Sequence, residues 1–249
     1  MTLARTAIRL GAVGILRGSA PDHPTLAGPR VFDSRMADIA PENFSEDAKP
    51  ILLVTTDSDD GDALSDANGG PPFRRNIDLI VELAMVARYR EGSGYVVGYP
   101  DTDARLEASL DLLEHQVIDV LANGTTDLAI AFQTKIRIWS RKSHRQTSDD
   151  TGVKIACRVL TLSCEISDDQ GGPLPSATGL DRLPQPMRAI CEQLPPGSSG
   201  RQACEAIAAA VQAHDRVPFE GIDWRFDAGK DDKPEHVVVG RTDFAGVAP

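Results

Sequence analysis

The chain has 249 residues, a formal net charge of −11 and a sequence pI of about 4.9. Its hydrophobic fraction of 41% is enough for a packed core, and its length suits one large domain or one domain with an extension. Because an acidic chain repels phosphate groups, we do not expect tight binding to duplex DNA. The sequence contains no run of about 18 apolar residues, so we expect no membrane-spanning segment.

The N-terminal segment, residues 2–17, predicts an amphipathic helix. Apolar residues recur in it at helical spacing, Thr2 is a candidate N-cap, and Gly18 follows as a stop. Arg5 and Arg9 interrupt the apolar stretch, which favours a packing helix over a signal peptide.

Three segments then predict strands: RVFDSR at 30–35, PILLVTT at 50–56, and a long strand at 73–88. The long strand alternates over more than ten positions, and its apolar face consists of Ile77, Leu79, Val81, Leu83, Met85 and Ala87. We expect residues 50–56 and 73–88 to form an antiparallel pair with an unusually long connection, and long ordered connections are usually functional.

The strongest helix signal covers residues 104–124. Leucine and valine recur at helical spacing, Asp101, Thr102 or Asp103 can cap its start, and the Asn-Gly pair at 123–124 can stop it.

The segments that follow are less uniform. Residues 128–140 are ambiguous between a strand and a short helix followed by a strand. Residues 141–152 are polar and predict a loop, and residues 153–166 predict a strand rich in β-branched and apolar side chains.

The composition changes after residue 167. Residues 180–195 and 200–215 predict two short helices around a Pro-Pro-Gly turn, and residues 222–226 and 236–240 predict short strands. We therefore expect an α+β fold: an antiparallel or mixed sheet flanked by the N-terminal helix and a second long helix, with a core at 1–167 and a mixed C-terminal extension at 168–249.

The four cysteines are Cys157, Cys164, Cys191 and Cys204. None forms a Cys-x-x-Cys pair, and none lies near a histidine at zinc-binding spacing. This pattern favours four reduced, partly buried thiols in a reducing compartment.

An acidic segment follows the second predicted strand and carries Asp57, Asp59, Asp60, Asp62 and Asp66. With Gly61 at the sixth position of an EF-hand loop, Ala67 would occupy the twelfth position, where glutamate is required. A non-standard divalent-cation site and a catalytic carboxylate cluster are alternatives. We favour a hydrated acidic loop that can also meet a basic partner surface.

A basic segment at 135–145 surrounds Trp139 with Lys135, Arg137, Arg141, Lys142 and Arg145. It can be a solvated face, a contact with nucleic acid, or a partner for the acidic segment of a neighbouring subunit.

No catalytic motif is complete. In GSGYVVG, at 92–98, the third glycine is one position late for a dinucleotide loop, so a hairpin-like turn is favoured. The sequence GSSGR does not satisfy Gly-x-Ser-x-Gly, and the five histidines form no i,i+4 pair. What is left suits a structural interaction protein, and we expect neither an enzyme nor a cofactor.

The order of these elements, with the phrases RVFDSR and NGGPPFRR, resembles the tail terminator (tail completion) proteins of long-tailed bacteriophages and gene-transfer particles. The resemblance covers residues 1–167. It implies a small sheet flanked by helices, and a homo-oligomeric ring, usually a hexamer, at the tail–neck junction of the virion. Such rings are not enzymes. They cap the head-proximal end of the tail tube, stop its polymerisation and contact the head completion proteins, and the extension after Ser167 departs from the shortest members.

A ring of this kind needs two different complementary patches, because its contacts are head-to-tail. Our candidate residues for contacts between subunits or with the tube are Asp57, Asp59, Asp60, Asp62, Arg74, Arg75, Lys135, Arg137, Arg141 and Lys142. We expect DNA to pass through the ring without specific binding. The alternatives are another neck connector or a baseplate component and, least favoured, a metal-binding enzyme.

Overall fold

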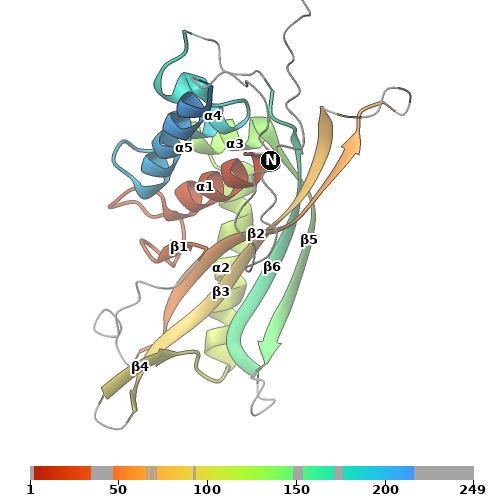
Figure 1. The fold of residues 1–249 in the computed structure, drawn as a ribbon. Helices are drawn as coiled ribbons and strands as arrows, with labels where there is room; N and C mark the ends of the chain where they lie inside the picture. Colours follow the sequence, from red (N-terminus) through yellow and green to blue (C-terminus); the bar gives the residue numbers. More distant parts are fainter. Residues whose placement is uncertain are drawn as a thin grey trace, which may run out of the picture.

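The computed structural model describes residues 3–34, 47–91 apart from 66, 68, 69 and 71, then 94–147, 154–170 and 176–215. Figure 1 shows a twisted sheet with α2 running along it and the other helices gathered toward one end. Both helix and strand content are substantial, which confirms the predicted α+β fold.

The strand order in the main sheet is β1-β2-β3-β6-β5, and β4 pairs with the end of β3. The short β1 is parallel to β2, and all other pairings are antiparallel. The strands are β1 (Val31–Asp33), β2 (Lys49–Ala63), β3 (Phe73–Glu91), β4 (Gly94–Gly98), β5 (Ile136–Thr147) and β6 (Lys154–Ser167). The helices are α1 (Ala4–Arg17), α2 (Ala104–Asn123), α3 (Asp127–Lys135), α4 (Met187–Gln193) and α5 (Ser199–Asp215).

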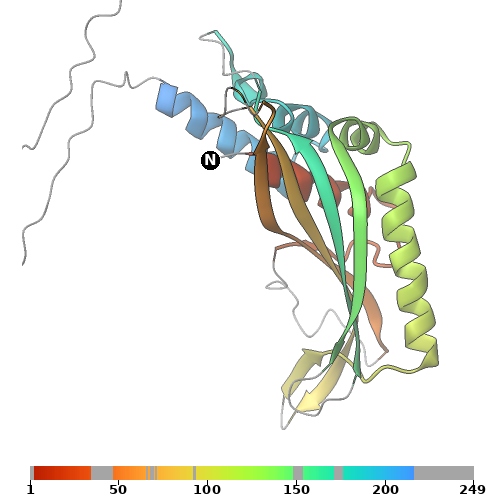
Figure 2. The ribbon, with the colours of Figure 1, turned by 90° about the vertical axis from the view of Figure 1, so that its right-hand side faces the viewer.

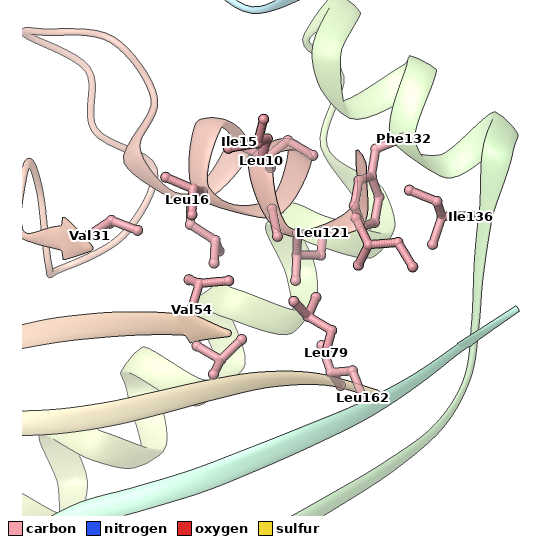
Figure 3. Close-up of a cluster of buried hydrophobic side chains, with 14 of the residues drawn as sticks. Leu10, Ile15, Leu16, Val31, Val54, Leu79, Leu121, Phe132, Ile136 and Leu162 are labelled. Carbon is pink, nitrogen blue, oxygen red and sulfur yellow. The ribbon is translucent and has the colours of Figure 1, made fainter. Parts of the chain in front are cut away.

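The predicted alternation of β3 is confirmed. The six residues from Ile77 to Ala87 assigned to its apolar face are all buried, and Figure 3 shows Leu79 meeting helix side chains such as Leu121. Helices α1 and α2 pack on this face, because their buried leucines share one core cluster with it. A smaller cluster, with Ala84 and Val86, lies on the opposite face.

The helix boundaries follow local capping chemistry. The Asp103 carboxylate accepts a hydrogen bond from the backbone N–H of Leu106 at the start of α2. Gly124 ends this helix, as predicted, and Thr126 caps α3. The ambiguous segment at 128–140 therefore contains a helix followed by the start of β5. Thr2, the predicted N-cap of the first helix, is not the cap: α1 begins at Ala4, with Leu3 at the N-cap position.

The described part of the C-terminal extension packs into the same core. Met187 and Ile190 of α4 and Ala208 of α5 are buried with residues of α1 and the sheet. The two predicted helices are thus confirmed, although α5 is long. The strands predicted at 222–226 and 236–240 lie outside the described residues.

Figure 2 shows α2 running beside the sheet, roughly along its strands.

The acidic segment is not a loop, so that prediction and the predicted long connection are wrong. Strand β2 continues through Asp57–Asp62, after a register shift between Thr56 and Asp59, to Ala63, which pairs with Phe73. Aspartate and glycine disfavour strands, but pairing context overrides this preference. Here the ion pair between Asp59 and Arg75 supports the ladder.

The polar loop predicted at 141–152 is also partly wrong. Residues 141–147 continue β5 and pair with β6 along most of their length. Their polarity is that of an edge strand, which needs no apolar residue on its solvent side.

The prediction of four reduced thiols is wrong as well. Cys191 of α4 and Cys204 of α5 form a disulfide with a Cα–Cα distance of 5.9 Å. Cys157 and Cys164 are free and buried, as expected. The disulfide removes the support that cysteine content gave to a reducing compartment. The hairpin expected around GSGYVVG is confirmed by the antiparallel pairing of β3 with β4.

Candidate functional site: two charged edges of the sheet

The strand order leaves two long edges with a single neighbour each. Among the residues that the structure describes, β5 pairs only with β6, and β1 pairs with β2 only at residues 52–54. Beyond that point, β2 has no second strand partner in the described part of the chain. Figure 1 shows this distal half of the β2–β3 hairpin at the end of the sheet where α1, α3, α4 and α5 gather, opposite the end that carries β4.

The β2 edge is acidic. Asp57, Asp60 and Asp62 are exposed, and none of them forms an ion pair with a described residue. Asp59 differs, because its carboxylate lies 2.5 Å from Arg75 and the two side chains are only 10% and 17% exposed. Asp59 and Arg75, both predicted as interface residues, therefore already form an ion pair with each other within one subunit.

The β5 edge is basic. Arg137, Arg141 and Lys142 are exposed, and Arg141 and Lys142 form no ion pair among the residues described. Arg145 is tied to Glu107 of α2 at 2.9 Å. Trp139 lies at a register shift between Ile138 and Ser140 and is 57% exposed. Strand β5 contains no acidic residue, so its whole length is positive.

The two edges are linked across the sheet by alternating charges. Glu165 of β6 lies between Arg74 of β3, at 3.4 Å, and Arg137 of β5, at 3.8 Å. Arg75 also approaches Asp168, at 3.6 Å. Because Arg74 and Arg137 are largely exposed, their pairs with Glu165 contribute little stability, about 0–1 kcal/mol each. Their arrangement matters more, since it sets the sign of charge at each edge.

A pocket of about 410 Å³ lies at the end of the sheet where β5 begins. Three predicted interface cations line it: Arg74, Lys135 and Arg137. The exposed Leu64 also lines it, and Glu165 is the one acidic residue among the described lining residues.

A charged cluster that the sequence analysis missed fixes α2 on the sheet. The Arg158 guanidinium contacts Glu107 and Asp111 at 2.6 Å and Glu114 at 3.3 Å. Burial raises the pKa of Glu107, but hydrogen bonds from Arg158 and Thr102 outweigh it, so the pKa lies below its ordinary value. The spacing of 107, 111 and 114 along one helix face was the available signal.

The described residues contain no group of three or more His, Cys, Asp or Glu side chains arranged to hold a metal ion. Burial raises the pKa of both Cys157 and Cys164 to about 12, so neither is a reactive thiol at neutral pH. Within the described ranges, no helix is long and apolar enough to cross a membrane.

Comparison with models of known protein families and with curated proteins found no match.

Proposed function

We propose that this chain is a structural virion protein that forms a ring, with six copies as the expected number. The ring caps the head-proximal end of a phage tail tube, ends tube polymerisation and joins the tail to the neck. Its partners are the tube protein and a head completion protein. It assembles in the bacterial host cytoplasm and has no enzymatic activity.

One observation carries the proposal: a single sheet has two open edges of opposite charge. Asp57, Asp60 and Asp62 mark one edge, and Arg141 and Lys142 mark the other. A ring requires two different complementary patches on each subunit, one for each neighbour. Groups without an ion pair inside the subunit are available for such contacts, and complementary charge favours correct encounters.

The net charge supports the same function. Each copy carries a formal charge of −11, so a ring of copies has strongly negative surroundings for a DNA channel. Phosphate binding depends on cationic contacts, which an acidic wall lacks. DNA can then pass without being held.

The test is the native mass of the purified full chain, with negative-stain images, alone and mixed with a purified phage tail-tube protein. We expect rings with a central hole at least as wide as duplex DNA. The variant R141E/K142E should weaken the ring. The control R90E/R105E, which reverses two exposed arginines away from the β5 edge, should not. A chain that stays monomeric with the tube protein present would refute the proposal.

A further inference from the structure

We propose that neighbouring copies join by β-strand pairing: residues 136–139, at the start of β5 of one copy, pair antiparallel with residues 58–61 of β2 of the next. This inference rests on the proposed ring but specifies how the subunits bind each other. The occupant of each open edge is then a second copy of this chain.

The strand directions fit this pairing. The neighbours β2, β3, β6 and β5 are all antiparallel, so β2 and β5 run in opposite directions. A rotation about an axis along the strands leaves each strand direction unchanged. It therefore brings β5 next to a β2 that runs the opposite way, and the pairing is antiparallel, the more stable form per residue.

The charges select this pairing and reject the others. Two acidic β2 edges repel each other, as do two basic β5 edges, and charged edges normally block association of this kind. Only β2 with β5 brings opposite signs together. Such a contact is heterologous, as a closed ring requires.

The limits of the pairing segment are built into the subunit. β1 occupies the β2 edge at residues 52–54. The Arg5 guanidinium of α1 then donates hydrogen bonds to the carbonyl oxygens of Thr56 and Asp57, at 3.0 and 2.5 Å. Both groups stop short of Ser58, so no described strand covers the β2 edge from residue 58 onward, and this edge can pair with a neighbour.

The register within one subunit predicts which residues meet. Asp60 pairs with Asn76, Asn76 with Glu165, and Glu165 with Arg137, so Asp60 and Arg137 lie on one row across the sheet. In copies at the same level, Arg137 of one copy faces Asp60 of the next. Directly opposed antiparallel residues have Cα atoms about 4.5–5.5 Å apart, close enough for their charges to pair.

The pocket at the start of β5 supports the alignment in which Arg137 of one copy faces Asp60 of the next. The next acidic residue along the β2 edge, Asp62, would lie opposite Lys135, which lines the pocket. Among the described lining residues, the cations Arg74, Lys135 and Arg137 outnumber the carboxylate of Glu165, which favours the approach of another negative group.

A charge swap tests the pairing in the full-length chain. We expect D60R or R137D alone to weaken assembly at least about tenfold in subunit concentration, because each places like charges together. The double variant D60R/R137D should restore assembly. The controls D22R and R105D, at exposed sites away from both edges, should leave it unchanged.

Cysteine cross-linking tests the register directly. The expected Cα separation lies within the range that a disulfide spans, about 4.4–6.8 Å. Oxidised D60C/R137C should give a ladder of covalent multimers, whereas D60C or R137C alone should give no species larger than a dimer.

The outcomes separate the two proposals. Wild-type rings together with assembly that is insensitive to both single reversals, or with no ladder from D60C/R137C, would overturn the strand pairing and leave the ring intact. Absence of any ring with tube protein present would overturn the proposed function and the pairing with it.

Discussion

Replacing Arg158 by methionine should destabilise the protein by removing the cation that holds α2 against the sheet. Arg158 is 8% exposed, and its partners Glu107 and Glu114 have side chains only 15% and 16% exposed. Removing one partner of a buried ion pair costs about 3–5 kcal/mol, because the remaining charge is left uncompensated. Arg145 still contacts Glu107, and the Ser143 hydroxyl still donates to Glu114. We therefore expect a loss near the lower end, about 3 kcal/mol at pH 7.

The pH dependence distinguishes this cause from simple loss of packing. The folded pKa of Glu107 is lowered, so in the wild type its contribution to stability is present above the unfolded pKa and is lost as the pH falls through the folded pKa. Without Arg158, the carboxylate of Glu107 loses a hydrogen bond and a charge that lower its pKa, so the folded protein protonates this group at a higher pH. The difference between variant and wild type should thus shrink at pH 4.

The assay is urea unfolding at pH 7 and pH 4, with melting temperatures as a second measure. For a chain of this size, about 3 kcal/mol corresponds to a fall of roughly 6–12 °C. The triple variant R158M/E107Q/E114Q should regain much of the loss, since it leaves no buried charge unpaired. The control R105M changes an exposed residue of α2, the helix that carries Glu107 and Glu114. It should change stability by less than about 0.5 kcal/mol. An equal loss for R158M at both pH values would refute the electrostatic explanation.

Two further predictions concern the helical layer. The variant C191A/C204A, or the wild type in reductant, should lose about 3 kcal/mol of unfolding free energy, because the disulfide closes a loop with a sequence separation of 13. Thiol titration of the unreduced, denatured wild type should find two thiols, and finding four would contradict the disulfide. The variant G124A should lose on the order of 2 kcal/mol, because an added Cβ would lie 2.4 Å from the Val120 carbonyl oxygen. Its melting temperature is compared with that of G98A, where the nearest side-chain atoms lie at an ordinary 3.6 Å.

The elements predicted best from sequence are those in which apolar residues recur at the spacing of a buried face. Strand β3 alternates because one face meets the helices, and α2 repeats its leucines because one face meets the sheet. Local capping by Asp103 and Gly124 then sets the helix ends. These signals are contained in the segments themselves, so no knowledge of the rest of the fold is needed.

The charged halves of β2 and β5 could not be predicted in this way. Asp57–Asp62 and residues 141–147 have the composition of loops, and only their pairing with β3 and β6 makes them strands. The disulfide has the same origin, since Cys191 and Cys204 face each other only because α4 and α5 pack together.

The sequence identified the charges of the candidate site but not their positions relative to each other. Two segments of opposite sign were visible, and a contact between subunits was one of three interpretations for the basic one. That they form opposite edges of one sheet depends on the strand order β2-β3-β6-β5, which joins residues far apart in the chain. The residue pattern within one segment does not show which strands lie next to each other in the sheet.

Salt should affect the two contributions to the proposed subunit contact differently. Charge attraction between exposed edges is screened over about 8 Å at 0.15 M ionic strength, whereas backbone hydrogen bonds between paired strands are not. Asp57, Asp60, Arg141 and Lys142 would therefore govern how quickly copies meet, and strand pairing would govern how long they stay together. Salt should slow association of the wild type more than it speeds dissociation. A ring held by charges alone would instead dissociate as salt is raised.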